Sequence, residues 1–338
     1  MGVNFKGLFE FEPRALSDFS GKLLAVDAYN TIYQFLSTIR QYDGTPLKDS
    51  EGRITSHLSG LFYRNINLLL ENIKPVYVFD GKPPVLKSST LEARKERKMR
   101  ARREYETALE KGDFEMAKSK ASQTAHMDER IVLESKALLE ALGIPSIQAP
   151  SEGEAQSAYL VQKGLCYATA SQDYDSLLFG TPLLVRNINT SGKRKLPKKN
   201  AYVQITPEEV KLSYVLNKLG IDRDQLILVG MLCGTDFNEG VRGIGPKTAI
   251  KKVKEHKTFD ALKKALDWNE PYLEEVFSLF KNPSVTQTKE ITFSKPNEDV
   301  VKTILVDKHE FSEERINATL TKLREQKQSQ SQTNLFNY

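Results

Sequence analysis

Three short apolar runs, each followed closely by aspartate, limit the fold of this chain more than any other feature of its sequence. The runs and their aspartates are Leu23–Val26 before Asp27, Pro75–Phe79 before Asp80, and Cys166–Ala170 before Asp173 and Asp175. Such runs, without polar alternation, are typical of strands buried on both faces of a parallel sheet. Helical spacing over Ala28–Arg40 and His57–Asn72 separates the first two runs, and Pro182–Arg186 has the pattern of a fourth strand. The sequence therefore predicts an α/β fold with a mostly parallel central sheet flanked by helices.

A charged stretch from Lys87 to Gly143 has helical propensity and a break at Gly112–Asp113, which predicts a helical insertion between two strands. A capping box at Thr206–Glu209, with proline at the first helical position, predicts a helix running towards Gly220. Further helices are expected over 222–232, 247–256 and 312–326. The polar segment from residue 326 is expected to be disordered until bound.

Composition and charge exclude several classes of protein. No apolar run approaches the roughly 20 residues of a membrane-spanning helix, and the first residues lack a signal-peptide apolar region, so we expect a soluble, unexported protein. Two cysteines and four scattered histidines give little support to a disulfide framework, a zinc site or catalysis by Ser, Cys or His.

The net charge of the chain is only +5, but three basic islands lie at 82–103, 193–199 and 247–257. Such islands suit contacts with phosphates, although solvated helix faces give the same pattern.

Acidic residues gather where an α/β sheet forms its site. The seven are Asp27, Asp80, Glu152, Glu154, Asp173, Asp175 and Asp236. Because sites in open α/β sheets lie beyond the carboxyl ends of the strands, we expect these side chains to converge. Seven carboxylates repel one another, and oxygen ligands favour Mg²⁺ or Mn²⁺, two of which about 3.5–4 Å apart would support phosphodiester hydrolysis. Taken singly, the aspartates after the strands would equally serve as helix caps or turn residues.

The segment Gly243–Lys247 has the form of a helix-hairpin-helix turn, in which small residues let backbone amides approach a DNA phosphate. A P-loop is disfavoured, because Pro246 stands where lysine must follow the glycine and no strand precedes the turn. A plain helix-start turn remains an alternative.

Five segments resemble the signature blocks of flap endonucleases, within the XPG-type 5′ nucleases, and they occur in order over nearly the whole chain. They are VFDGKPP (78–84), PSEGEAQ (150–156), SQDYDSL (171–177), GTDF (234–237) and RGIGPKTA (242–249). The resemblance implies a structure-specific 5′ flap endonuclease with 5′–3′ exonuclease activity, acting in Okazaki fragment maturation and in DNA repair. The alternatives are a relative that cuts bubbles or junctions, and a non-catalytic DNA-binding scaffold associated with a sliding clamp.

The resemblance also implies residue roles. A first metal ion would be held by Asp27, Asp80, Glu152 and Glu154, and a second by Asp173, Asp175 and Asp236. Lys87 and Arg94 would form a catalytic basic pair at the base of a helical arch. Contacts with DNA are implied for Tyr33, on which a base would stack, and for Arg40, Arg64, Glu152, Gly234, Asp236, Gly243, Gly245 and Lys247. The carbonyls of Val241 and Ile244 would hold a K⁺ in the helix-hairpin-helix.

The same resemblance implies an N-terminal nuclease region (1–98), a helical arch (99–126), an internal nuclease region with the helix-hairpin-helix (127–258), a C-terminal helical part (259–325) and a flexible tail (326–338). In the tail, Gln332, Leu335 and Tyr338 resemble a motif that binds the sliding clamp (PCNA), but the chain stops at the first aromatic residue. No basic extension follows, which resembles archaeal members. Besides the clamp, the implied partner is branched DNA carrying a 5′ flap, bound by a monomer inside the cell, in the cytoplasm or nucleoid of an archaeon or in a eukaryotic nucleus.

Overall fold

A seven-stranded sheet in the order β1-β9-β6-β5-β2-β3-β4 forms the centre of the computed structural model, which describes residues 2–41, 43–190, 192–195 and 202–335. The strands are β1 Glu12–Pro13, β2 Leu23–Asp27, β3 Lys74–Phe79, β4 Ser146–Gln148, β5 Ala168–Ala170, β6 Leu183–Arg186 and β9 Glu208–Lys211. The strands from β6 to β4 run parallel, and β9 and β1 add antiparallel pairs at one edge. The predicted α/β fold with a mostly parallel sheet is confirmed.

Strand β2 lies in the middle of the parallel strands and accounts for the first apolar run. It pairs with β3 on one side and β5 on the other, with Val26 in register with Tyr77 and Ala170. Leu24 and Val26 enter the core on one face of the sheet, while Ala25 enters the core on the other face. A strand buried on both faces needs apolar side chains at every position, which explains the absence of polar alternation.

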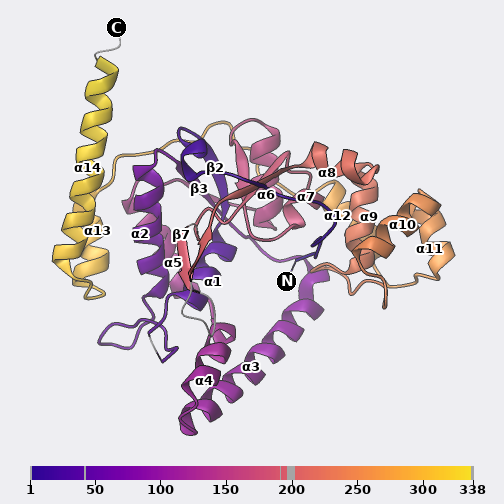
Figure 1. Cartoon of the computed structure of the whole chain (residues 1–338), viewed down its shortest axis with the longest axis horizontal. Coiled ribbons are helices and arrows are strands. Elements are labelled where there is room, and N and C mark those ends of the chain that lie inside the picture. Colours follow the sequence, from indigo (N-terminus) through magenta and orange to yellow (C-terminus); the bar gives the residue numbers. More distant parts are fainter. Residues whose placement is uncertain (1, 42, 191, 196–201, 336–338) are drawn as a thin grey trace.

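Helices cover both faces of this sheet (Figure 1). One face carries α1 Ala28–Thr38, α2 Ser56–Leu70 and α5 Glu129–Ala141, and the other carries α6 Gly153–Gln162 and α7 Asp175–Leu178. The hydrophobic core on the side of α6 and α7 continues into five further helices. They are α8 Leu212–Leu219, α9 Arg223–Cys233, α10 Pro246–His256, α11 Phe259–Leu266 and α12 Leu273–Lys281. The helices expected over 222–232 and 247–256 are thus present as α9 and α10. A separate hairpin of β7 Gly192–Lys195 and β8 Tyr202–Ile205 was not predicted.

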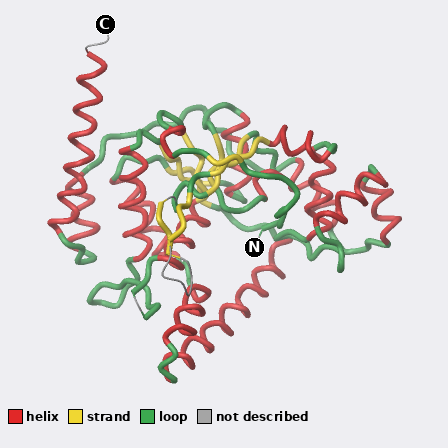
Figure 2. Tube along the Cα trace, viewed as in Figure 1, coloured by secondary structure: helices red, strands yellow, loops and turns green. Residues whose placement is uncertain are grey.

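The charged insertion projects from the body of the molecule (Figures 1 and 2). Helix α3 Ser88–Glu110 runs away from the sheet, and α4 Phe114–Ala121 returns beside it. The predicted break falls at Gly112, whose φ of 68° is a left-handed conformation that glycine adopts at low cost. A 3₁₀ turn over Ser122–Thr124 then leads back to α5.

The C-terminal part of the chain packs on the hydrophobic core that contains α1, α2 and α5. In the segment after α12, where the chain crosses back over the body, the N–H of Ser294 donates to the carbonyl of Gly143 at 3.1 Å. Helix α13 Glu298–Lys302, a π-helical turn over Thr303–Asp307 and α14 Glu313–Leu335 follow. Helix α13 lies against α5, and α14 lies against α2 and extends beyond the body (Figure 1).

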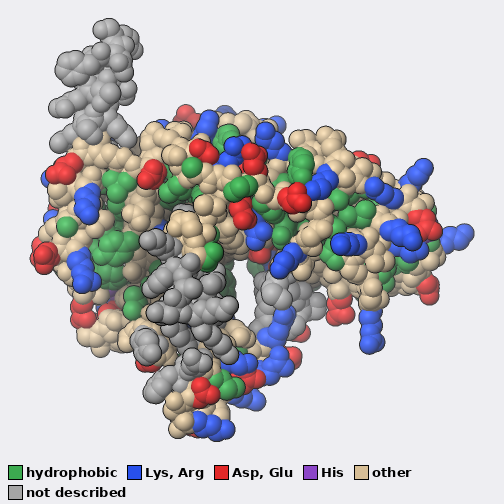
Figure 3. Space-filling model, viewed as in Figure 1, with side chains coloured by type: hydrophobic (Ala, Val, Ile, Leu, Met, Phe, Trp, Pro, Cys, Tyr) green, Lys and Arg blue, Asp and Glu red, His purple; other side chains and the backbone are tan. Residues whose placement is uncertain are grey.

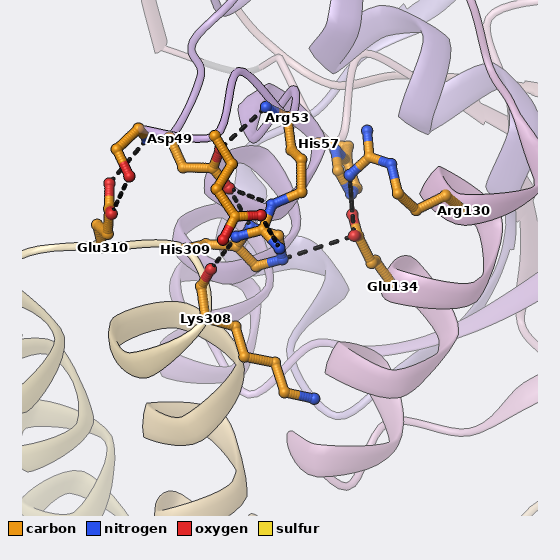
Figure 4. A network of polar contacts seen from close by, with 10 residues as sticks. Asp49, Arg53, His57, Arg130, Glu134, Lys308, His309 and Glu310 are labelled. Carbon is orange, nitrogen blue, oxygen red and sulfur yellow. Dashed lines mark hydrogen bonds and ion pairs between the residues drawn. The ribbon is translucent and has the colours of Figure 1, made fainter.

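A polar network fastens this C-terminal part to the loop between α1 and α2 (Figure 4). The buried carboxylate of Asp49 lies 2.9 Å from His309 Nδ1 and accepts a hydrogen bond from Arg53 Nε at 2.7 Å. Glu134 on α5 lies 3.0 Å from Nε2 of the buried His57 and 3.6 Å from His309 Nε2. Three distant parts of the chain therefore meet through titratable side chains.

The capping box at Thr206–Glu209 does not open a helix, so this prediction is wrong. The segment leads into strand β9 instead, and α8 begins only after that strand. Val210 is in register with Leu184 of β6, and the buried carboxylate of Glu209 accepts a hydrogen bond from Arg14 at 2.6 Å. Pairing partners from distant parts of the chain outweigh the local capping signal.

Helix α14 continues to Leu335, so the segment expected to be disordered from residue 326 is helical that far. Buried Ile316, Leu320 and Leu323 set the register of the helix, and the residues from 324 to 335 include no proline or glycine to end it. Within the described ranges, no helix is long and apolar enough to cross a bilayer.

Candidate active site

The seven acidic residues of the sequence analysis line one cavity of about 420 Å³. They are Asp27, Asp80, Glu152, Glu154, Asp173, Asp175 and Asp236. Three of them end or follow the parallel strands β2, β3 and β5, which point towards the same edge of the sheet. The others come from the start of α6, the start of α7 and the turn after α9. The structure brings all seven together because parallel strands deliver their carboxyl ends to one edge.

Gly153 allows helix α6 to begin directly against Asp80. Its N–H donates to Asp80 Oδ1 at 2.6 Å, and a Cβ at this position would lie 2.7 Å from the same oxygen. A larger residue would push the helix and the strand end apart. The glycine therefore lets the two glutamates at the start of α6 share a cavity with the strand-end aspartates.

Burial and mutual repulsion raise the pKa of several carboxyl groups in the cavity. For Asp27 and Glu154, burial comes first and neighbouring carboxylates add to it, so that each pKa lies well above its ordinary value. Burial raises the pKa of Asp175 to about 7, although its Oδ1 accepts a hydrogen bond from the N–H of Val3 at 2.6 Å. Such a site has an excess of negative charge that a bound cation would relieve.

Lys87 brings a positive charge into this cluster. Its Nζ lies 2.7 Å from Glu152 Oε2 and 3.6 Å from Asp236 Oδ2. Burial by itself lowers the pKa of Lys87, but the two carboxylates outweigh burial and the pKa is raised. The ammonium group therefore stays protonated between two acidic side chains.

Two neutral donors that the sequence analysis missed orient three of the carboxylates. Asn30 donates from its backbone N to Asp27 Oδ1 and from Nδ2 to Asp173 Oδ2, both at 2.9 Å. Ser171 Oγ donates to Glu154 Oε1 at 3.2 Å. Asn30 stands in the first turn of a helix that follows a strand-end aspartate, but a polar residue at such a place is too common to identify its role from the sequence.

Tyr33 on α1 lines the same cavity. Its side chain is 40% exposed, and Lys98 Nζ on α3 lies 5.8 Å from the centre of its ring. An exposed aromatic ring at the edge of a cavity can stack on a base. Arg94, the expected partner of Lys87, belongs to α3, and its side chain lies outside the part of the structure that is described.

Three other expected DNA contacts are not among the residues that line the cavity. Arg40 donates to the carbonyls of Leu36 at 3.0 Å and Gly44 at 2.9 Å, and so holds its own loop. Arg64 is partly buried on α2. Gly234 is the C-cap of α9, with a φ of 89° that favours glycine.

The glycine-rich turn joins α9 to α10. Gly243 has a φ of 82°, and Gly245 is the N-cap of α10, which a proline opens. A Cβ at either glycine would meet nothing within 4 Å, so the outer side of the turn is open. The carbonyl of Val241 accepts the N–H of Ile244 at 3.0 Å, and Lys247 is exposed.

Two of the basic islands can be followed on the surface. Lys and Arg side chains lie along α3 and at the end of the molecule formed by α10 and α11 (Figure 3). In the island at 193–199, the side chains of 193–195 and the whole of residues 196–199 lie outside the described residues.

The three residues of the expected clamp-binding motif lie at the end of the chain. Gln332 and Leu335 fall within α14, but their side chains are not described, and Tyr338 lies outside the described residues.

Comparison with known proteins agrees with this arrangement. Residues 5–101 match the family model of the XPG N-terminal domain, and residues 143–236 match that of the XPG I-region. The chain is 52% identical over 331 residues to flap endonuclease 1 of Aeropyrum pernix, covering 96% of this chain and 94% of the relative. It is 49% identical over 336 residues to flap endonuclease 1 of Pyrococcus furiosus, covering 99% and 98%.

Two solved structures resemble the fold of this chain over nearly its whole length. Flap endonuclease-1 from Methanococcus jannaschii has a TM-score of 0.76 at 38% identity, covering 96% of this chain and 98% of that chain. The catalytic core of Rad2 in complex with a DNA substrate has a TM-score of 0.68 at 26% identity, covering 93% and 96%. The chain belongs to the flap endonuclease family of XPG nucleases.

Proposed function

We propose that this nuclease hydrolyses one phosphodiester bond at the base of a single-stranded 5′ flap in branched DNA, with divalent cations held in the carboxylate cavity. The observation that carries the proposal is the cavity itself: seven carboxylates face one space, and Lys87 reaches into it from the foot of a basic helix. Acidic clusters of this kind repel DNA unless cations compensate them, whereas the basic helix attracts it.

The donor chemistry of the cavity fits Mg²⁺, with Mn²⁺ as an alternative. All seven side chains offer oxygen. Burial first, and then the neighbouring carboxylates, raise the pKa values of Asp27, Glu154 and Asp175. The ammonium of Lys87 already lies between two of the carboxylates, as a cation would. Among the described residues, no three histidine, cysteine or carboxylate side chains are arranged to hold one ion directly.

We assign one ion to four of the carboxylates and a second ion to the other three. The first set is Asp27, Asp80, Glu152 and Glu154, and the second is Asp173, Asp175 and Asp236. When bound, such ions supply a nucleophilic water and neutralise charge on the scissile phosphate. Lys87, with Arg94 two turns further along, would stabilise the additional charge that develops as the bond breaks. Asn30 and Ser171 would keep the carboxylates aimed at the ions.

The protruding helices suit a single-stranded flap. The basic residues of α3 would guide the flap backbone, and Tyr33 would stack on a base next to the cut. Arg40 and Arg64 would contact phosphates nearby. The geometry of these groups, rather than base sequence, would select the substrate.

The turn between α9 and α10 suits duplex DNA. Gly243 and Gly245 leave the backbone open for a phosphate, Lys247 adds charge, and the carbonyls of Val241 and Ile244 would hold a K⁺ in a helix-hairpin-helix. We further propose 5′–3′ exonuclease activity, action as a monomer in Okazaki fragment maturation and repair, and a sliding-clamp contact through Gln332, Leu335 and Tyr338.

Cleavage of matched substrates tests the proposal. A labelled double-flap DNA, a bubble and a four-way junction of the same sequence are incubated with the protein and Mg²⁺, with EDTA as the control. We expect fastest cleavage at the base of the 5′ flap and none in EDTA. Faster cutting of the bubble or junction would instead indicate a relative with that specificity, and binding without cleavage would indicate a scaffold.

A further inference from the structure

The turn that carries Asp236 is closed by its own hydrogen bonds. Thr235 Oγ1 donates to Asn238 Oδ1 at 2.8 Å, and the N–H of Thr235 donates to the carbonyl of Asn238 at 3.0 Å. Gly234 and Gly240 bracket the turn at φ values of 89° and 78°, and a Cβ on Gly240 would lie 2.4 Å from the nitrogen of Gly234. The two ends of the turn therefore touch backbone to backbone. The position of Asp236 depends on how this closed unit is held as a whole.

Glu270 holds the turn from a different part of the chain. It lies in the loop between α11 and α12, and its Oε1 accepts the N–H of Glu239 at 2.8 Å. Its Oε2 accepts Asn238 Nδ2 at 3.4 Å and Trp268 Nε1 at 3.3 Å. Trp268 is buried and packs edge-to-face against Phe259, with ring centres 6.2 Å apart. The carboxylate therefore connects the turn to a side chain that is fixed in the core of α10–α12.

A carboxylate is well suited to this place, because it accepts several hydrogen bonds and donates none. Without it, the N–H of Glu239 loses its acceptor. Asn238 Nδ2 would keep its bond to the carbonyl of Met231 at 2.8 Å. The turn would then lose its hydrogen bonds to the α11–α12 loop and keep the one to the carbonyl of Met231 on α9. Glu270 is not among the residues that line the cavity, so any effect on the chemistry must pass through the turn.

We infer that Glu270 is a positioning residue, which fixes the turn from Gly234 to Gly240 and thereby the place of Asp236 among the other carboxylates. This inference rests on the function proposed above, in which Asp236 is a metal ligand. It gives the α11–α12 loop a part in cation binding, although that loop is remote from the central sheet in sequence.

Cation binding measured without DNA tests the inference. Mn²⁺ is titrated calorimetrically into the wild type, Glu270→Ala, Glu270→Gln and the control Glu274→Ala. The control removes a carboxylate that pairs with Lys263 and does not touch the turn. We expect Glu270→Ala to weaken Mn²⁺ binding by about tenfold, the lower end of the effect of outer-shell partners on a metal site. Glu270→Gln keeps an oxygen for the N–H of Glu239 and should restore part of the affinity.

The Mg²⁺ dependence of flap cleavage provides a second readout. We expect the half-saturating Mg²⁺ concentration of Glu270→Ala to rise with its Mn²⁺ dissociation constant, while KM for DNA changes little. A merely structural role would lower the melting temperature and the active fraction without moving either midpoint, and that result would overturn the inference. Should Glu270→Ala fail to fold, Glu270→Gln decides, and midpoints equal to those of the wild type would overturn it. A wild type that binds Mn²⁺ but cuts no flap would refute the proposed function, and the Mn²⁺ titrations would still decide the role of Glu270.

Discussion

At the scale of single residues, the ammonium of Lys87 lies 2.7 Å from Glu152 and 3.6 Å from Asp236. Negative charge grows on the scissile phosphate as the bond breaks, so under the proposed function a fixed cation at this place would stabilise the transition state more than the bound DNA. We expect Lys87→Ala to slow single-turnover flap cleavage by about 10²–10³-fold, the usual effect of removing one preorganised donor. Lys163→Ala is the matched control, because Lys163 lies over the ring of Tyr159 outside the cavity. Equal rates for Lys87→Ala and the wild type would show that this charge has no part in the reaction.

The acidic residues could be predicted from the sequence, but the groups that orient them could not. Asp27 and Asp80 stand out because each ends an apolar run, and parallel strands must bring them to one edge. The hydrogen bond from Asn30 to Asp173 joins residues 143 positions apart, and its existence depends on how α1 packs against the end of β5. A single polar residue in a first helical turn is also too common to indicate such a role by itself.

At the scale of elements, the glycine-rich turn at 243–247 is a place where a substitution should leave the fold intact. Gly245 has open space around its missing Cβ, so Gly245→Val should fold normally. The added side chain would occupy the side from which a phosphate approaches, and we expect duplex affinity to fall about tenfold, or about 1.4 kcal/mol. Fluorescence anisotropy with duplex DNA measures this, and Mn²⁺ titration should give the wild-type dissociation constant. Unchanged duplex affinity would exclude a DNA-contacting role for the turn.

Elements with a continuous pattern could be predicted, whereas elements made by distant partners could not. Strand β2 is apolar throughout because both of its faces are buried, and α10 begins at a proline, so each has a local signature. Strand β9 begins within the capping box at Thr206–Glu209, yet its pairing with β6 and the ion pair between Glu209 and Arg14 decide its conformation. The end of α14 is similar, because packing of its first turns on α2 sets a helix that polar residues then continue.

At the scale of the whole molecule, the network in Figure 4 makes stability depend on pH. Burial lowers the pKa of His57 in the folded protein below the value near 6.5 that an imidazole has in the unfolded chain. The unfolded chain therefore binds a proton at His57 more readily, and the folded state loses stability as the pH falls through about 6.5. Burial alone would raise the pKa of Asp49, but His309 and Arg53 hold it well below its usual range. The stabilisation by Asp49 is therefore complete above about pH 4 and is lost below it.

Urea unfolding at several pH values checks this prediction. We expect the free energy of unfolding of the wild type, relative to His57→Gln, to decrease between about pH 7.5 and 5.5. Relative to Asp49→Asn, it should decrease below about pH 4. The comparison with variants is needed because Asp175, whose pKa is raised to about 7, favours the folded state of the metal-free protein at lower pH. A difference between wild type and His57→Gln that does not change with pH would contradict the role of His57.

Divalent-cation-dependent hydrolysis in the carboxylate cavity is tested most directly by the single-turnover rate on a labelled double-flap DNA, with and without Mg²⁺, for the wild type and Asp173→Ala. Asp173 faces the cavity and is oriented by Asn30, so its loss removes a proposed ligand from the second ion. We predict rapid cleavage at the flap base by the wild type with Mg²⁺, none in EDTA, and a rate at least about 10²-fold lower for the variant. Cleavage that persists in EDTA, or at the wild-type rate in Asp173→Ala, would contradict the assignment of the cavity as the active site.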